Sequence, residues 1–345
     1  TYGEVGFFDE GEAFDEIKLI YLKGKDYNDP LWETLLNRMT WDETCYLLQE
    51  GLRFTNAVES IVAPSSSQQN GGLGPVLSRA DGGLPSQSGF RGFAETRDPE
   101  NMGRKPATFV CNGIVAATYN VEFMRKLGEQ AGEEGIWAGY NGIYGLGVNI
   151  HRGAYCGRAF EYYSEDGWLS GVMCAAEASG MREKGISPVP KHFALNDQEN
   201  GRYGISTWSN EQAIREVYLE GFEEYAKNGG TAIMSSFNRI GVVWAGAHHG
   251  LMTGILRDEW GMKGAAITDC SVSAKYMDYR LGVLAGQDLW DGYSSGMATL
   301  DGLDNDPAIV TACQTAAKRI AFSISRSHAM NIGRADIVLI MPWWK

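Results

Sequence analysis

The 345-residue sequence lacks the signals that mark several common protein classes. Its six cysteines form no Cys-x-x-Cys pair, so their spacing predicts neither a zinc site nor a redox motif, although an even number leaves disulfides open. No apolar run reaches the ~18 residues that a membrane helix needs, so membrane association is not indicated. The formal net charge of −13 disfavours nucleic acid as a partner.

The start of the chain carries no recognisable secretory signal, and it begins with Thr1 rather than methionine. Nothing in the sequence indicates a cellular compartment. Hydrophobic residues make up 44% of the chain and charged residues 21%, as is usual for a globular protein. The length is enough for one large domain or two ordinary ones.

From about residue 106, strand-like and helix-like segments alternate along the chain. Short apolar segments predict strands at 144–150, 187–195, 231–237, 264–269 and 287–290. Between or after them, helices are expected at 120–135, 164–184, 209–228, 249–260 and 273–286, the first three capped by Asn120, Ser164 and Ser209. This alternation predicts an α/β fold, a TIM-like (β/α)8 barrel that need not be regular.

A doubly wound open sheet is the alternative architecture. Two absences weaken it, because no Gly-x-Gly-x-x-Gly follows the first clear strand and no P-loop motif occurs. We expect an irregular N-terminal segment at 1–31, the barrel at 32–305, and a C-terminal helix with an apolar tail at 306–345. Near the start of the barrel, Thr40 and Glu43 form the pattern of a capping box.

Polar residues gather where the predicted strands end, which is where the active site of a parallel barrel lies. The residues at these ends are Lys191, His192, Met234, Ser235, Ser236, Asn238, Asp269, Asp288 and Asp291. Asp269 follows the apolar segment "GAAIT" with no basic residue beside it. A rigid strand end can hold a reacting carboxylate in a fixed direction, although an aspartate that caps a turn is the common alternative.

Four segments, "GRAFEYYSED", "KHFALNDQENGRYG", "AIMSSFNRIG" and "LMTGILRDEWGMKGAAITD", occur in the order found in family 3 glycoside hydrolases. Over about residues 32–330 the chain resembles the barrel domain of a β-glucosidase or β-xylosidase. The resemblance implies a retaining glycosidase that releases terminal β-linked glucose or xylose through a glycosyl-aspartate intermediate. It implies no metal and no organic cofactor, and it implies oligosaccharide or aryl β-glucosides and β-xylosides as substrates.

The same resemblance implies a set of site residues. Asp269 corresponds to the catalytic nucleophile, which positive neighbours should keep ionised by lowering its pKa. The implied sugar-binding residues are Asp81, Arg158, Lys191, His192, Met234 and Phe237, and Arg202 corresponds to a supporting residue. Ordinary alternatives exist, since Arg158 could simply pair with Glu161 and Lys191 could extend to solvent along the sheet end.

Three departures from the family pattern affect the expected site. Cys270 stands where the family commonly has a tryptophan that walls the sugar site, and Phe237 stands where a tyrosine is usual. The third departure concerns the general acid, a second carboxyl that retaining cleavage needs. Larger members supply it from a separate α/β sandwich domain, for which this chain has no room after residue 330. We therefore expect the acid outside the chain; a carbohydrate-binding barrel without turnover and a transglycosidase are the alternatives.

Overall fold

The computed structural model describes residues 17–71, 107–292 and 299–331. Its main sheet has the strand order β1-β2-β3-β4. Strands β2 (Ser66–Asn70), β3 (Gly142–Gly147) and β4 (Ser187–Lys191) are parallel, and β1 (Phe54–Thr55) joins the edge antiparallel to β2. A second parallel pair consists of β6 (Ala232–Ser235) and β9 (Ala265–Thr268).

Isolated bridges connect these two groups of strands. A parallel bridge joins Phe193, just after β4, to Ser235 of β6, and another joins Ile267 of β9 to Leu289. Beyond Leu289, the amide of Trp290 donates to the carbonyl of Leu48 (2.9 Å), near the start of the sheet. Parallel strands alternating with helices confirm the α/β expectation. Among the described residues, however, the strand ladders are separate sheets and do not form a closed cylinder.

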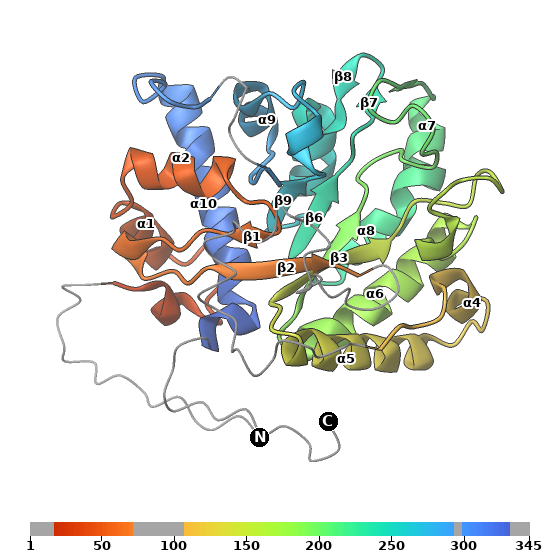
Figure 1. Cartoon of the computed structure of the whole chain (residues 1–345). Coiled ribbons are helices and arrows are strands. Elements are labelled where there is room, and N and C mark those ends of the chain that lie inside the picture. Colours follow the sequence, from red (N-terminus) through yellow and green to blue (C-terminus); the bar gives the residue numbers. More distant parts are fainter. Residues whose placement is uncertain (1–16, 72–106, 293–298, 332–345) are drawn as a thin grey trace.

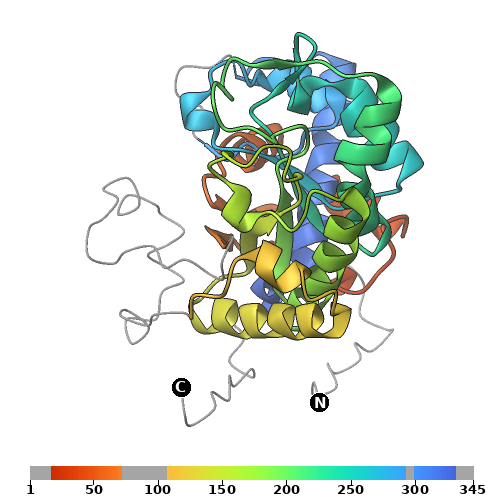
Figure 2. The same cartoon turned by 90° about the vertical axis from the view of Figure 1, so that its right-hand side faces the viewer.

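Helices cover the outside of the strands (Figure 1), and Figure 2 shows the same layers from the side. The principal ones are α1 (Leu31–Leu36), α2 (Trp41–Gln49), α4 (Asn112–Ala116), α5 (Val121–Trp137), α6 (Gly167–Glu183), α8 (Glu220–Lys227), the π-helix η8 (Gly250–Glu259), α9 (Tyr279–Ala285) and α10 (Pro307–Ser325). Helix α10 shares a hydrophobic core with β9, because Ile309, Cys313 and Ile320 pack in the same cluster as Ala265 and Ile267. No helix in the described ranges is long and apolar enough to cross a membrane.

Two of the four helix caps predicted from the sequence are confirmed. Thr40 and Glu43 form the predicted capping box, and the side chain of Asn120 caps α5. The predicted caps Ser164 and Ser209 are wrong. Asp166 caps α6 and Asn210 caps the short helix α7 (Glu211–Ala213). In both cases an Asx residue one or two positions later provides an equally good acceptor, so the helix begins there.

Strand β4 contains Pro188 and Pro190, which cannot donate hydrogen bonds. Prolines usually limit a ladder to the residues beyond them, but β4 pairs with β3 from its first residue, Ser187. On the side of β4 that faces β6, pairing begins only after the prolines, at the bridge between Phe193 and Ser235. There the hydroxyl of Tyr225, on helix α8, lies 3.1 Å from the carbonyl oxygen of Pro188 and 2.9 Å from that of Ala232.

Loops beyond β4 and β6 form a small additional sheet at the top of Figure 1. It consists of β5 (Ser206–Thr207), β7 (Arg239–Ile240) and β8 (Val243–Trp244). Because these loops follow the carboxyl ends of β4 and β6, the small sheet stands beside the strand ends at which the candidate site residues lie. All six cysteines of the chain are described, and all are free thiols.

Candidate active site

Asp269 is held directly after β9 by backbone contacts. Its amide donates to the carbonyl of Ser235 at the end of β6 (2.9 Å), and its Oδ1 accepts from the amide of Cys270 (2.8 Å). Strand β9 can pack this closely against β6 because it follows Gly264, where a Cβ atom would lie 1.8 Å from the carbonyl oxygen of Thr231. The other carboxylate oxygen, Oδ2, is buried and has no hydrogen-bond partner among the described residues.

His192, at the end of β4, faces this oxygen. Its Nε2 lies 3.5 Å from Asp269 Oδ2, and its Nδ1 lies 3.5 Å from the side-chain amide nitrogen of Asn196. Because that amide is a donor, Nδ1 is the acceptor and the proton of the neutral ring is on Nε2. Burial, followed by the charges of Arg158, Lys191 and Arg202, holds the pKa of His192 well below its ordinary value. The imidazole is therefore neutral.

A network of ion pairs surrounds these two side chains. Glu161 binds Arg158 (2.7 Å) and Lys191 (3.2 Å), and Glu199 binds Arg158 (2.8 Å) and Arg202 (3.0 Å). The residues come from three segments, namely the end of β4, the loop after it, and the loop that follows β3. Three cations thus share two carboxylates, and Asp269 supplies the third negative charge that balances the cluster.

The pKa of Asp269 is raised, against the expectation that its positive neighbours would lower it. Burial is the largest cause, and it outweighs the amide of Cys270 and the charges of Arg202, Arg158 and Lys191, all of which lower the pKa. The cations therefore reduce a desolvation penalty rather than make the carboxyl more acidic than usual. Of the three, Arg202 has the largest effect on Asp269, although the sequence suggested only a supporting place for it.

The remaining predicted residues differ in where they lie and in what they contact. Met234 is buried in β6, and the ring of Phe237 is buried beneath Tyr203 (ring centroids 4.5 Å apart) and the guanidinium of Arg202 (4.6 Å from the ring centroid). Asp81 lies outside the described residues. Ser236 and Asn238 bind carbonyl oxygens of the loop after β4, so they shape that loop.

We expected Asp288 and Asp291 to lie with Asp269 at the carboxyl ends of the strands. This expectation is wrong for Asp288. Its side chain accepts from the amide of Ala266, near the start of β9, and pairs with Arg257 and Arg319. Only Leu289 of the predicted strand 287–290 pairs with β9. Asp288 precedes this point and lies at the opposite end from Asp269.

Asp291, in contrast, is buried close to the candidate site. Its Oδ1 accepts from the amide of Arg53 (2.6 Å) and from the hydroxyl of Tyr144 (3.0 Å). Burial raises its pKa to about 7, and the charge of Asp269 contributes to this shift. Arg53 and Tyr144 were not predicted as neighbours of the site, because neither stands at the carboxyl end of a predicted strand. The phenol in the middle of the glycine-rich strand "GIYGLG" was the only available signal.

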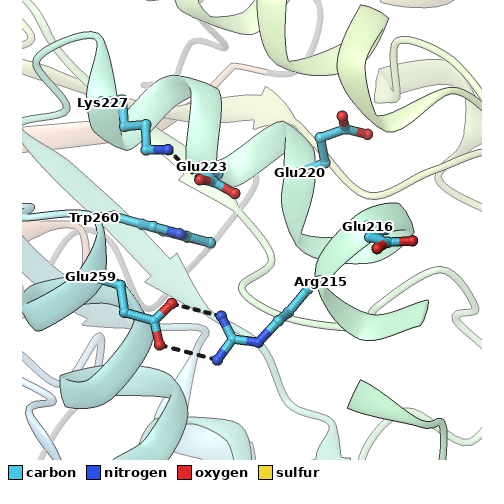
Figure 3. A pocket seen from close by; sticks show the side chains of 7 residues that line it. All are labelled: Arg215, Glu216, Glu220, Glu223, Lys227, Glu259 and Trp260. Atoms are coloured by element: carbon cyan, nitrogen blue, oxygen red, sulfur yellow. Dashed lines mark hydrogen bonds and ion pairs between the residues drawn. The ribbon is translucent and has the colours of Figure 1, made fainter. Parts of the chain in front are cut away.

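A separate groove of about 470 Å³ lies on the outer helices (Figure 3). Its lining residues are Arg215, Glu216, Glu220, Glu223, Lys227, Glu259 and Trp260. Arg215 pairs with both carboxylate oxygens of Glu259 across this groove. The groove is formed by η6 (Ile214–Leu219), α8 and the end of η8 rather than by strand ends. Within the described ranges, no group of three His, Cys, Asp or Glu side chains is arranged to hold a metal ion.

Comparisons with known proteins agree on one family. The family model described as "Glycosyl hydrolase family 3 N terminal domain" matches residues 65–287. Beta-glucosidase A of Butyrivibrio fibrisolvens is 36% identical over 224 residues, which cover 64% of this chain and 26% of that protein. The chain thus spans about a quarter of the length of this curated relative.

Solved structures show the same similarity. A beta-glucosidase from Paenibacillus barengoltzii superposes with a TM-score of 0.75 at 26% identity, over 93% of this chain and 35% of that one. Beta-glucosidase 3B from Thermotoga neapolitana, solved with α-D-glucose, gives a TM-score of 0.75 at 22% identity, over 87% of this chain and 43% of that one. The latter likeness concerns the fold alone.

Proposed function

The chain belongs to glycosyl hydrolase family 3, and from that premise we propose that it carries the nucleophile of a retaining β-glycosidase. The proposed substrates are β-linked glucosides or xylosides, cleaved at the non-reducing end. Supporting this choice, the Butyrivibrio relative is named a beta-glucosidase. The general acid is proposed to lie outside this chain, because Glu161 and Glu199 are both engaged with cations.

In the proposed reaction, Asp269 Oδ2 attacks the anomeric carbon of the sugar. A bond forms between Oδ2 and this carbon while the bond from the carbon to the leaving oxygen breaks, and the general acid protonates that oxygen. Water then attacks the same carbon, loses a proton to the deprotonated acid, and releases the sugar with its configuration retained. Asp269 regains its carboxylate.

The side chains around Asp269 are proposed to hold the sugar. Lys191 and Arg158 are oriented by Glu161, so their remaining donors can bind sugar hydroxyl groups. Neutral His192 can donate from Nε2 to a hydroxyl group that lies beside Asp269 Oδ2. Met234 and Phe237 are proposed to pack beneath the sugar, Asp81 to accept from its hydroxyls, and Arg202 to support Glu199.

One observation carries the proposal, namely that Oδ2 of Asp269 has no hydrogen-bond partner in the part of the chain that the structure describes. A buried carboxylate oxygen without a hydrogen bond is costly, and native structures rarely retain one without a reason. Here the oxygen faces a neutral imidazole and lies within the influence of three cations. This oxygen would act as the nucleophile toward the electron-poor C1 of a sugar bound above it.

Covalent trapping tests the proposal. The full chain is incubated with 2,4-dinitrophenyl 2-deoxy-2-fluoro-β-glucoside, whose good leaving group needs little protonation by an acid. We expect the mass of the protein to rise by one fluoroglucosyl group, located on Asp269 by peptide mapping. Asp269→Asn should not be labelled, whereas Asp258→Asn, at an exposed carboxyl on η8, should be labelled normally.

Other outcomes would assign a different function. Saturable sugar binding without labelling or hydrolysis would indicate a carbohydrate-binding barrel. Transfer of the sugar to an added alcohol or to phosphate in preference to water would indicate a transglycosidase or a phosphorylase. Labelling at another carboxyl would overturn the assignment of Asp269.

The architecture proposed for the chain is an irregular barrel at about 32–305, with an irregular segment (1–31) before it and a helix and apolar tail (306–345) after it; residues 1–16 and 332–345 of these segments lie outside the described residues. The superposition on the Paenibacillus enzyme supports this arrangement, as does the hydrogen bond from the amide of Trp290 to the carbonyl of Leu48, which joins the last strand segment to helix α2.

A further inference from the structure

Three loops bring aromatic side chains together beside Asp269. Tyr203 lies in the loop after β4, Phe237 follows β6, and Tyr276 lies in the loop after β9. The rings of Tyr203 and Phe237 are in contact, and the hydroxyl of Tyr276 donates to the carbonyl of Phe237 (2.7 Å). Tyr203 is 44% exposed and Tyr276 is partly exposed, so both rings can contact a bound molecule.

Tyr276 lies close enough to Asp269 for their charges to interact. Burial is the main cause that raises the pKa of Tyr276 to about 12, and the negative charge of Asp269 contributes. The hydrogen bond from Tyr276 to the carbonyl of Phe237 holds the ring against the segment after β6, and the amide of Asp269 binds the end of that same strand at Ser235. Cys270 follows Asp269 in place of an aromatic residue, so Tyr276 is an aromatic side chain that can stand near the proposed sugar site.

Arg239, on β7, differs from the other cations of this region. Its guanidinium carbon lies 4.2 Å from the centre of the Tyr276 ring, and one of its nitrogens donates to the carbonyl of Tyr203 (3.1 Å). Arg158, Lys191 and Arg202 are all paired with carboxylates, whereas Arg239 makes no ion pair with any residue that the structure describes. A partly exposed guanidinium without a counter-ion can bind an anionic group.

We propose that Tyr276 and Arg239 form the subsite for the leaving group, and that this subsite favours a planar aromatic group bearing a carboxylate. The inference rests on the proposed function, since it places the sugar over Asp269 and the leaving group toward these loops. The exposed ring of Tyr276 offers a surface for stacking. Arg239 supplies the positive charge that an anionic ligand needs in a chain whose net charge is −13.

The binding of three thioglycosides tests this subsite without a cleavage reaction. Methyl, phenyl and 4-carboxyphenyl 1-thio-β-glucoside carry the same sugar, and their sulfur linkage resists hydrolysis. Titration calorimetry of the full chain should show phenyl binding about three- to tenfold more tightly than methyl through stacking. The carboxyphenyl compound should bind a further factor of about three to ten more tightly, and this second advantage should decline as salt is raised.

Single substitutions separate the two contributions. Arg239→Gln should remove the preference for the carboxyphenyl compound and keep most of the preference for phenyl over methyl. Tyr276→Ala should reduce the preference for phenyl, and Tyr276→Phe should keep it because the ring remains. Arg215→Gln, in the outer groove of Figure 3, makes the same change of charge away from the strand ends and should leave all three affinities unchanged.

The outcomes distinguish this inference from the function on which it rests. Equal affinities for the three compounds, or a carboxylate preference that persists in Arg239→Gln, would overturn the subsite. If Asp269 is nevertheless labelled by the fluoroglucoside, the proposed function stands. If none of the three compounds binds and no labelling occurs, both proposals fall.

Discussion

An aspartate lies beside each end of strand β9, Asp288 fully buried and Asp269 with 13% of its side chain exposed, and the two carboxylates have opposite surroundings. Near the start of the strand, Asp288 is fully paired, because Oδ2 accepts from Arg257 (2.8 Å) and the amide of Ala266 (2.7 Å), and Oδ1 accepts from Arg319 (3.1 Å). After the strand's last residue, Asp269 has one oxygen bound by the amide of Cys270 and the other without a hydrogen bond in the described part of the chain.

This difference separates a structural carboxylate from the one proposed to be the nucleophile. Asp288 joins η8, β9 and α10 through the side chains of Arg257 and Arg319 and the amide of Ala266. The cations near Asp269 are directed mainly at Glu161 and Glu199, which leaves Oδ2 available to an incoming atom. Burial alone therefore does not identify a catalytic residue, since both aspartates are largely buried, whereas incomplete pairing does distinguish them.

The largest expected effect concerns the reactive end. Asp269→Asn should lower the rate on dinitrophenyl β-glucoside on the order of 10⁴-fold or more, as removal of a nucleophile does in other enzymes. Stability should change little, because the amide removes a charge that burial opposes. Steady-state kinetics and a thermal melt measure the two quantities, and activity within tenfold of the unsubstituted chain would exclude Asp269 as the nucleophile.

Substitution of Asp288, near the start of β9, should lower stability and leave the labelling of Asp269 nearly unchanged. Asp288→Asn leaves buried Arg257 and largely buried Arg319 without the carboxylate that they share, which should cost about 3–5 kcal/mol of unfolding free energy. Urea titration measures this loss. Protein that is still folded at low temperature should be labelled by the fluoroglucoside at nearly the normal rate; a large loss of labelling without a loss of stability would remove the distinction between the two ends.

Asp291 provides an intermediate case, because its pKa in the folded protein is raised to about 7. Between its ordinary value near 4 and about 7, the folded state holds a proton that the unfolded state has released, so stability increases as pH falls through this window. We expect Asp291 itself to contribute a gain of about 2 kcal/mol from pH 7 to pH 5, in addition to any contribution from Glu177 and Asp197, whose pKa values burial also raises. Asp291→Asn cannot titrate and should lack this gain, which urea titrations at the two pH values would reveal.

The smallest effect tests the charge of Arg202. Removing this cation should raise the pKa of Asp269 further, since its charge lowers that pKa in the structure. The acidic limb of the labelling rate should therefore move to higher pH in Arg202→Gln. Arg215→Gln should leave the profile in place, and a shift to lower pH in Arg202→Gln would contradict the assigned electrostatics.

Much of the contrast between Asp269 and Asp288 could be predicted from the sequence. The predictions that failed did so for physical reasons. The apolar segment before Asp269 predicted a buried strand with a carboxylate at its end, and the structure has both. Asp288 was misplaced because only Leu289 of the segment 287–290 pairs with β9, so the residue before it faces the other end. A short strand gives no pattern from which its two ends can be told apart.

The electrostatic prediction failed for a different reason. Positive residues can be counted in a sequence, but the extent to which Asp269 is removed from water depends on packing between β6, β9 and the loops beyond them. That packing decides the direction of the shift in its pKa. Likewise, the contact between Arg239 and Tyr276 joins two loops that are 37 positions apart in the chain, and no local pattern announces it.

The hydroxyl of Tyr225 has a consequence for the whole site. Where the prolines of β4 leave no donor toward β6, this phenol on the outer helix α8 contacts the carbonyls of both strands. A side chain from the solvent-side layer thus sets the spacing of the two strands that carry Lys191 and Met234. Any molecule or substitution that displaces α8 would alter the spacing of β4 and β6 from the outer side, without contacting any of the residues proposed to bind the sugar.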